Sequence, residues 1–194
     1  MSLYPEYNII ERYPAEKTIG FTGVNLEWGI FSNFANTPLE VNGKKFTCSE
    51  HLYHYIRLNN EKDREEYLKR KRDLTMKGVT KGWKKRGIER SDWREIAVDV
   101  MRFCLNYKYE QSEVFRNELE RSKGYYIIED ESNRKGKNIP DSWGAAYDTE
   151  TNEYYGKNIM GRLLMELREK GKLESNYEID FGNDIDVDLT NIYK

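Results

Sequence analysis

The feature that most constrains the fold is an apolar helical pattern that directly follows a polar loop. Its spacing predicts a helix that turns one face to the core. Asn158 is placed to cap this helix, and Gly171 is placed to end it. The members of the pattern are Ile159, Met160, Leu163, Leu164 and Leu167.

The loop in front of this helix is the first candidate for a functional site. It begins Asp141-Ser142-Trp143-Gly144, passes through the hydrophilic stretch Asp148 to Glu153, and returns at Tyr154-Tyr155-Gly156-Lys157-Asn158. A rigid helix that supports a polar, glycine-containing loop is typical of a binding site. We therefore expect residues 141–158 to form a loop that contacts a ligand.

Composition indicates a folded protein with a heavily charged surface. The chain has 194 residues, of which 38% are hydrophobic, 34% charged and 13% aromatic, and the aromatic share argues against disorder. No apolar run approaches the ~20 residues that cross a bilayer, and the start of the chain lacks a signal-peptide pattern. We expect a cytoplasmic protein without membrane contact. Cys48 and Cys104 lie in apolar segments and are expected to be buried thiols.

The net charge of -2 hides two segments of opposite sign. Residues Lys69 to Arg94 contain eleven basic and three acidic residues, with Trp83 and Trp93 among them. This pattern fits a surface that faces phosphate or nucleic acid, or else a solvated face. The segment from Glu174 onward is acidic, and we treat residues 174–194 as a tail outside a domain of residues 1–173.

Periodicity predicts several helices and a few short strands. A hairpin is expected around the Asn42-Gly43 turn, and strands at Thr18 to Val24 and Tyr125 to Ile128. Neither a repeat nor a linker indicates a second domain. The expected helices begin near Ser49, Glu61, Ser91, Val114 and Ile159.

Glu50 is expected in the first turn of the helix that begins near Ser49. A carboxylate there either stabilises the helix dipole or serves as a catalytic group on a rigid element. Both histidines, His51 and His54, follow on the same helix. Their spacing can hold a metal, but the sequence contains no third histidine, so we expect neither a metal nor a cofactor.

Four stretches, in order and spacing, resemble the NADAR (YbiA-like) family, and the resemblance covers roughly residues 29–168. The acidic tail lies outside the family pattern. The stretches are Phe31-Ser32-Asn33-Phe34; Thr47-Cys48-Ser49-Glu50-His51; Trp93 through Lys108 to Gln111; and Ile128-Glu129-Asp130 with Asp141-Ser142-Trp143-Gly144, Gly156-Lys157-Asn158 and Gly161 to Arg168.

The resemblance implies a compact, mainly helical α+β single domain with a small β-sheet. It also implies N-glycosidase activity, which is hydrolysis of the bond between a base-like nitrogen and ribose. It further implies phosphoribosylamino-pyrimidine intermediates of riboflavin synthesis, or ADP-ribose attached to guanine, as substrates. The basic segment Lys69 to Arg94 would then face ADP-ribosylated DNA or RNA. The sequence leaves the choice of substrate and the oligomeric state open.

Glycoside cleavage passes through an oxocarbenium-like state, which needs negative charge near the anomeric carbon and a proton for the leaving group. Glu50 and Asp141 are the candidate catalytic residues, with acid and base unassigned, and we expect them to lie close together. The predicted substrate-binding residues are Phe31, Ser32, Asn33, Phe34, Trp93, Lys108, Glu129, Trp143, Gly144 and Asn158.

Two functions from other classes compete with this hypothesis. The same aromatic and amide residues suit a non-catalytic module that binds ADP-ribose or a nucleotide. A protein whose basic face and acidic tail only mediate interactions would have no affinity for nucleotides. Turnover distinguishes the enzyme from both alternatives, and nucleotide binding distinguishes the alternatives from each other.

Overall fold

The structure is a computed structural model that describes residues 5–70, 80–136 and 139–174, and its helices and short strands confirm the predicted α+β class. Among the described residues, no helix is both long and apolar enough to span a membrane. The helices are η1 (Pro5–Asn8), η2 (Ala15–Lys17), η3 (Gly29–Phe31), α1 (Ser49–Arg57), α2 (Glu61–Leu68), α3 (Trp83–Arg86), α4 (Trp93–Gln111), α5 (Glu113–Arg121) and α6 (Ile159–Lys170). The strands are β1 (Glu11–Pro14), β2 (Thr18–Phe21), β3 (Leu39–Val41), β4 (Lys44–Phe46), β5 (Tyr126–Glu129), β6 (Ala146–Asp148) and β7 (Glu153–Gly156).

The chain divides into two compact units, and each unit combines two separate stretches of sequence. Unit 1 consists of Met1–Ala35 and Ser112–Leu173, and unit 2 consists of Asn36–Gln111 and Glu174–Lys194. The predicted boundary at residues 173 and 174 stays a prediction, because residues 175–194 lie outside the described part of the chain.

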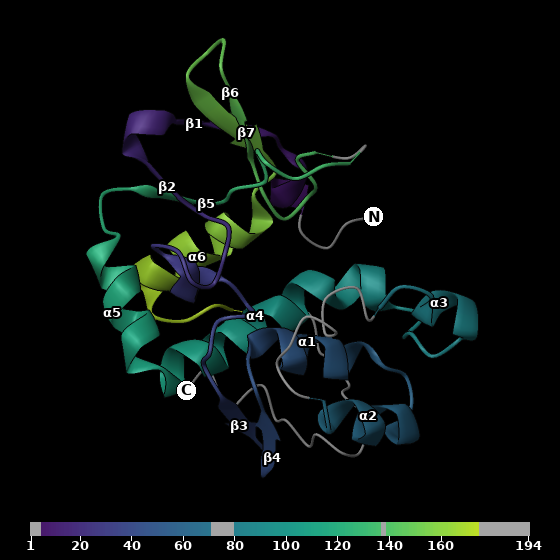
Figure 1. Cartoon of the computed structure of the whole chain (residues 1–194). Coiled ribbons are helices and arrows are strands. Elements are labelled where there is room, and N and C mark those ends of the chain that lie inside the picture. The colour runs from purple at the N-terminus through teal and green to yellow at the C-terminus, as the bar shows by residue number, and fades with distance from the viewer. Residues whose placement is uncertain (1–4, 71–79, 137–138, 175–194) are drawn as a thin grey trace. The chain divides into compact units, whose positions relative to one another are not determined.

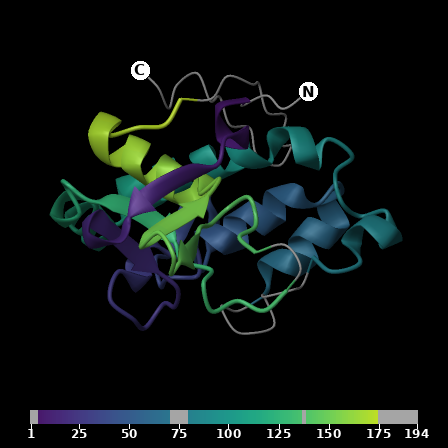
Figure 2. The same cartoon turned by 90° about the horizontal axis from the view of Figure 1, so that it is seen from above.

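Unit 1 contains two small sheets and the helices α5 and α6 (Figure 1). Strands β1, β7 and β6 form an antiparallel sheet, whereas β2 and β5 pair in parallel. The side-by-side course of β1 and β7 is also visible from above (Figure 2). Helix α6 packs along β5 and α5. The sequence predicted one small sheet, but the described strands form three, counting the β3–β4 hairpin of unit 2.

Helix α6 has the bounds and the buried face that the apolar pattern predicts. All five members of the pattern are buried, and Gly171 ends the helix with a φ of 72°. Gly161 lets the helix approach β5 closely, because a Cβ at this position would lie 2.0 Å from the carbonyl oxygen of Ile127. A glycine inside this helix is therefore a packing requirement.

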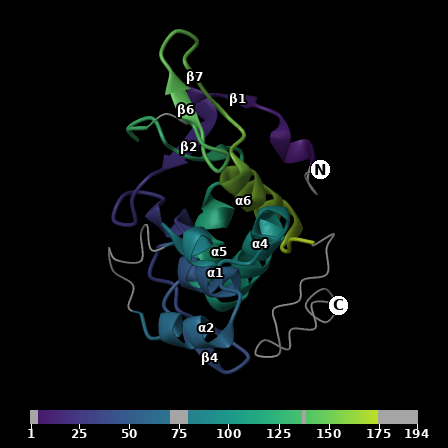
Figure 3. The same ribbon diagram turned by 90° about the vertical axis from the view of Figure 1, so that its right-hand side faces the viewer.

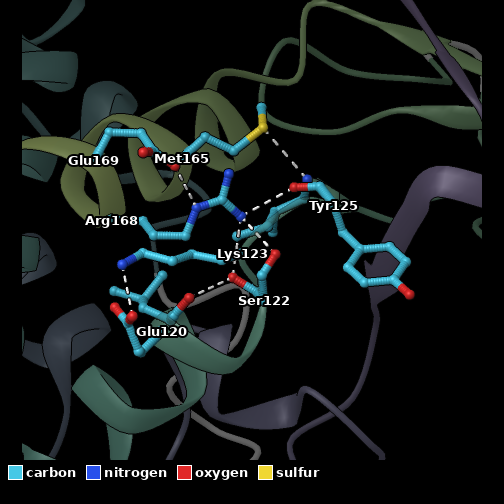
Figure 4. A network of polar contacts seen from close by, with 9 residues as sticks. Glu120, Ser122, Lys123, Tyr125, Met165, Arg168 and Glu169 are labelled. Carbon is cyan, nitrogen blue, oxygen red and sulfur yellow. Dashed lines mark hydrogen bonds and ion pairs between the residues drawn. The ribbon is translucent and has the colours of Figure 1, made fainter.

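The turn from α5 to β5 is held by Arg168 of α6 (Figure 4). Its Nη1 donates to the carbonyl oxygens of Ser122 and Tyr125 at 2.8 and 2.9 Å, and to Ser122 Oγ at 3.1 Å. The Sδ atom of Met165, also on α6, accepts a hydrogen bond from the Ile127 backbone N–H at 3.4 Å. One helix thus satisfies polar groups at the turn and at the start of β5.

Unit 2 is built around α1, which packs against α4 and α2 (Figure 3). The β3–β4 hairpin forms as predicted, with positive φ at Asn42 and Gly43, and leads into α1. Cys48 and Cys104 are buried free thiols, which confirms that prediction. Within the basic segment, the described residues include α3, and residues 71–79 lie outside the described part.

The prediction of a continuous loop over residues 141–158 is wrong for its second half. Strands β6 and β7 form a hairpin there, and β7 pairs with β1 of the N-terminal region. Tyr154 and Tyr155 favour strand structure, but the polar residues between them and β6 obscured the pattern. Pairing with β1, more than 130 residues away in the sequence, further stabilises β7.

Candidate functional site

Glu50 lies where the sequence places it, in the first turn of α1. The extended backbone of Cys48 begins the helix, and His54 follows Glu50 by one turn on the same face. His54 Nε2 lies 2.9 Å from Glu50 Oε1. The side chains of Glu50 and His54 keep only 17% and 9% of their surface exposed, so this pair is largely shielded from water.

Three aromatic rings pack against the His54 ring. The His54 ring centroid lies 5.6 Å from Tyr53, 6.3 Å from Tyr67 and 5.9 Å from Trp83. Burial raises the pKa of the Tyr53 and Tyr67 hydroxyls, and the negative charge of Glu50 raises it further. These phenols therefore stay neutral beside the carboxylate. A charged group in such surroundings interacts more strongly with a developing cation than it would in water.

Trp93 and Lys108 are both placed by α4. The Trp93 ring packs edge-on against Tyr53 at 4.8 Å and faces the Arg57 guanidinium at 5.2 Å. Arg57 also pairs with Glu89, where Nε lies 2.8 Å from Oε2. Lys108 has no exposed surface, and burial lowers the pKa of its ammonium group to about 7.

In unit 1, Asp141 opens the Trp-Gly loop, which we define as Asp141–Gly144. Its Oδ1 accepts a hydrogen bond from the Trp143 backbone N–H at 2.8 Å, and its Oδ2 lies 2.6 Å from Arg134 Nη1. The Asp141 backbone N–H donates to Glu131 Oε2 at 2.6 Å, and Arg134 also pairs with Glu131. Asp141 is thus held at three of its atoms.

Glu131 is a member of this network that the sequence analysis did not select. Its side chain is buried, and burial, assisted by the nearby charge of Asp141, raises the pKa of its carboxyl group. The signal was present in the sequence, because Glu131 follows β5 in the acidic run Glu129-Asp130-Glu131. Only Glu129 was selected from that run, since burial of individual members cannot be read from a charged stretch.

The Trp-Gly loop also caps helix α6, the role predicted for the Asn158 side chain. The carbonyl oxygens of Ser142 and Trp143 accept hydrogen bonds from the backbone N–H groups of Ile159 and Met160 at 3.2 and 3.1 Å. The Asn158 side chain makes no cap hydrogen bond. It is buried and donates to the Ile127 carbonyl oxygen at 2.9 Å instead.

Asn158 and Gly144, two of the predicted site residues, also contact strand β5. Asn158 Oδ1 accepts a hydrogen bond from the Glu129 backbone N–H at 3.3 Å, so the amide joins α6 to β5. A Cβ at Gly144 would lie 2.6 Å from the Glu129 carbonyl oxygen. The absence of a side chain at Gly144 therefore allows a close backbone approach to the protein's own strand β5.

The stretch from Phe31 to Phe34 contains one core residue and three half-buried ones. Phe31 has no exposed surface and contacts the rings of Phe21, Trp28 and Phe115, and its predicted contact with substrate stays a prediction. Ser32, Asn33 and Phe34 are half-buried. Asn33 Nδ2 lies 3.7 Å from Sδ of Met160, the second residue of α6.

The predicted site residues thus form two groups. In unit 1, Asn33, Trp143, Gly144 and Asn158 gather at the first turn of α6, where Asp141 opens the loop. In unit 2, the Trp93 ring contacts the Tyr53 ring, and the charge of Glu50 acts on the Tyr53 hydroxyl. The expected closeness of Glu50 and Asp141 stays a prediction, because the two residues belong to different units.

Unit 2 also contains a cavity of about 150 Å³ that borders the aromatic surroundings of His54. Tyr67 and Trp83 line this cavity and contact the His54 ring by their edges. Two arginines and two carboxylates contribute to its lining. The lining residues are Leu58, Asp63, Glu66, Tyr67, Arg70, Trp83, Arg86 and Ile88.

Within the described ranges, no group of three or more His, Cys, Asp or Glu side chains is arranged as a metal site. The His51 ring nitrogens have protein partners, since Nδ1 accepts from the Thr47 backbone N–H at 3.3 Å and Nε2 lies 3.0 Å from the Tyr67 carbonyl oxygen.

The chain is similar to known proteins over most of its length. A family model described as NADAR domain matches residues 20–171. Proteins named N-glycosidase YbiA from Shigella boydii and Escherichia coli K12 are each 31% identical over 165 residues, which is 85% of this chain and 95% of theirs. A riboflavin biosynthesis protein of Vibrio vulnificus is 24% identical over 164 residues, which is 84% of this chain but 41% of that protein.

A solved structure has a similar fold. The NMR structure of the E. coli protein YbiA matches with a TM-score of 0.59 and 28% identity, covering 84% of this chain and 92% of that one. The matched region includes both groups of predicted site residues, because the family model begins before Phe31 and ends after Asn158.

Proposed function

Because the chain belongs to the NADAR domain family, we propose that it cleaves the bond between a base-like nitrogen and the ribose of a phosphoribosyl or ADP-ribosyl compound. The predicted family is confirmed, and so is the enzyme class, a hydrolase acting on N-glycosyl compounds, since curated relatives named N-glycosidase match most of the chain. The substrate and the residue roles are our proposal.

The observation that carries the proposal is the shielded carboxylate of Glu50. It sits on a rigid helix, bonds to His54, and is surrounded by phenols whose pKa is raised. Cleavage of a C–N glycosidic bond develops positive charge on the sugar, and a fixed anion in a poorly hydrated site stabilises that charge. Glu50 serves as this anion or activates the attacking water.

The second carboxylate in the proposal is Asp141. Its position is fixed by Trp143, Arg134 and Glu131, so it needs little reorganisation to act on a substrate. The neighbouring Glu131 has a raised pKa and can retain a proton at higher pH than an exposed carboxyl group. Asp141 and Glu131 therefore supply the groups that protonate or accommodate the leaving nitrogen.

Half-buried aromatic and amide groups would recognise the base and the ribose. Trp143 and Phe34 offer ring faces, and Asn33 offers both a donor and an acceptor beside the first turn of α6. These residues belong to unit 1, together with Asp141. In the proposal they hold the nucleoside part of the substrate.

Two substrate classes remain in the proposal. A protein with riboflavin biosynthesis in its name is among the relatives, which favours a phosphoribosylamino-pyrimidine. The basic segment, with Arg70 and Arg86 at the cavity of unit 2, favours a phosphate-rich substrate such as ADP-ribosylated DNA or RNA. The two classes release different sugars, so one assay can separate them.

We expect wild-type protein to release sugar from at least one of two substrates, guanine-ADP-ribosylated DNA and the phosphoribosylamino-pyrimidine. The Glu50→Gln variant should turn over about 100- to 10,000-fold more slowly, because the amide cannot supply the negative charge. Mass spectrometry of the released sugar identifies both activity and substrate. Glu61→Gln, the same change at an exposed position of α2, should leave turnover unchanged.

The outcomes distinguish the remaining functions. Release of ADP-ribose by wild type identifies a nucleic-acid hydrolase, and release of ribose phosphate identifies clearance of a metabolite. If neither substrate is cleaved but ADP-ribose binds in a calorimetric titration, the protein is a binding module. Equal turnover by wild type and Glu50→Gln would remove Glu50 from the mechanism.

A further inference from the structure

The hydrogen-bond partners of His54 determine where the protons of the Glu50–His54 pair lie. Nε2 faces Glu50 Oε1 at 2.9 Å. Nδ1 is buried and has no hydrogen-bond partner among the described residues. An imidazole nitrogen without a partner can be either a bare lone pair or an N–H group, and burial penalises these two states differently.

Three arrangements of protons preserve the Nε2 contact when Oε2 of Glu50 carries no proton. In the first, neutral His54 donates its Nε2–H to an ionised Glu50. In the second, His54 is charged and carries a proton on both nitrogens. In the third, protonated Glu50 donates to Nε2, and His54 carries its proton on Nδ1. The second and third arrangements bury an N–H group at Nδ1 without an acceptor.

The first arrangement is favoured because it leaves no buried donor unsatisfied. A buried N–H without an acceptor loses its hydrogen bond to water, whereas an unused lone pair on a neutral nitrogen is tolerated more readily. The rings of Tyr67 and Trp83, packed edge-on around His54, provide an apolar environment that disfavours an added charge. This arrangement places the His54 proton on Nε2 and makes Oε1 of Glu50 its acceptor.

His51 provides an internal comparison on the same helix. Its Nε2 faces the Tyr67 carbonyl oxygen, and its Nδ1 accepts from the Thr47 backbone N–H. Burial lowers the pKa of this imidazole. Both of its ring nitrogens are used by backbone groups of the fold. Among the described residues, the His54 ring instead makes its polar contact with the candidate catalytic carboxylate.

We propose that His54 is a positioning residue for the reaction, which holds Glu50 as an oriented carboxylate by donating its Nε2–H to Oε1. The proposal rests on the proposed function, since it assumes that Glu50 acts on the substrate. It also decides which of the two roles, acid or base, Glu50 has. An ionised carboxylate has no proton to give to the leaving nitrogen, so it cannot be the acid. Glu50 is the base, and the acid comes from elsewhere in the site.

The proton balance of the step follows from this assignment. Water adds to the anomeric carbon while the C–N bond breaks and its electron pair stays on the leaving nitrogen. Glu50 takes one proton from the water through the oxygen not bonded to His54. The leaving nitrogen receives one proton from the acid, and proton exchange with solvent restores both groups.

The first test is independent of activity. The protein contains only two histidines, so a long-range ¹H–¹⁵N correlation spectrum of the imidazole rings has two sets of signals, and His54→Gln assigns them. We expect one protonated and one unprotonated nitrogen for His54, with the proton on Nε2. A proton on Nδ1, alone or together with Nε2, would overturn the proposal.

The second test compares two substitutions of His54. Gln retains an N–H donor that can reach Glu50, whereas Leu has a similar volume but no donor. We expect His54→Leu to lower kcat about 10- to 100-fold with little change in KM, because hydrogen bonds to charged groups contribute that much. His54→Gln should recover kcat to within about threefold of wild type.

The two tests keep the proposal separable from the proposed function. Unchanged kcat in a folded His54→Leu protein overturns the role of His54 and leaves the enzyme assignment intact. The role of His54 is also overturned if both variants lose activity while their circular dichroism spectra match that of wild type. The N–H donor of glutamine would then have failed to replace that of His54. If wild type cleaves no N-glycoside, the proposed function fails, and with it the role of His54 in the reaction.

Discussion

Asp141 has two carboxylate oxygens with different partners. Oδ1 accepts from the Trp143 backbone N–H and shapes the Trp-Gly loop, whereas Oδ2 pairs with Arg134. A carboxylate in such a position contributes to loop structure whether or not it takes part in catalysis. The structural and chemical contributions can be separated, because asparagine retains the first contact and loses the charge of the second.

We expect Asp141→Asn to lower turnover about 100- to 10,000-fold while the loop keeps its conformation, because the charge acts on the substrate. Asp141→Ala should lose a similar factor and also destabilise the loop. Steady-state kinetics and thermal denaturation measure the two effects. Near-normal turnover in Asp141→Asn would show that Asp141 only shapes the loop.

A matched control for this prediction exists in β6. Asp148 accepts a hydrogen bond from the Glu150 backbone N–H at 3.0 Å and lies 3.3 Å from Arg12 Nη1, so it has the same kinds of partner as Asp141. Asp148→Asn makes the same chemical change outside the candidate site. Its turnover should equal that of wild type.

At the scale of elements, α6 connects the parts of unit 1 that carry the predicted site. Its first turn receives the carbonyl oxygens of the Trp-Gly loop, and the Asn158 side chain bonds the backbone of β5. Gly161 allows this close contact between helix and strand. The position of the loop therefore depends on how closely α6 approaches β5.

We expect Gly161→Ala to destabilise the protein by about 1–3 kcal/mol or more, because the added methyl group overlaps the Ile127 carbonyl oxygen and the Asn158 amide. Urea denaturation measures the change. Gly136→Ala is the control, since a Cβ there has no heavy atom within 4 Å. A Gly161→Ala protein as stable as wild type would mean that α6 can shift away from β5 at no cost.

For the molecule as a whole, Lys108 links folding stability to pH. Burial lowers the pKa of its ammonium group from 10.5 to about 7 in the folded state. Between these two values the unfolded chain binds more protons than the folded one, so this residue makes stability rise with pH by at most about 1.4 kcal/mol per pH unit. Below the folded-state pKa, the folded protein contains a buried charge.

We expect Lys108→Met to stabilise the protein most below about pH 7, with a difference from wild type that shrinks as pH rises toward the pKa of an unfolded lysine. Urea denaturation at several pH values measures the difference. Lys62→Met, at an exposed position of α2, should keep the pH dependence of wild type. A difference that grows with pH would contradict the lowered pKa.

Much of the fold could be predicted from neighbouring residues alone. The hairpin at Asn42-Gly43, the first turn of α1 with Glu50, and the start and end of α6 were all found as expected. The α+β class and the family were also predicted correctly. The hairpin and the helix ends depend on turn preferences and helical spacing, which act over a few residues, whereas the class and the family were expected from the resemblance of four stretches.

The sequence by itself thus determined the local elements, the family and the set of polar and aromatic residues available for a site. Only the tertiary structure decided which of them are buried and what they bond. It placed β1 beside β7, turned the Asn158 side chain to β5, and buried Glu131 beside Asp141. These outcomes depend on residues far apart in the sequence, because burial and hydrogen-bond satisfaction are properties of the packed chain and not of any short stretch within it.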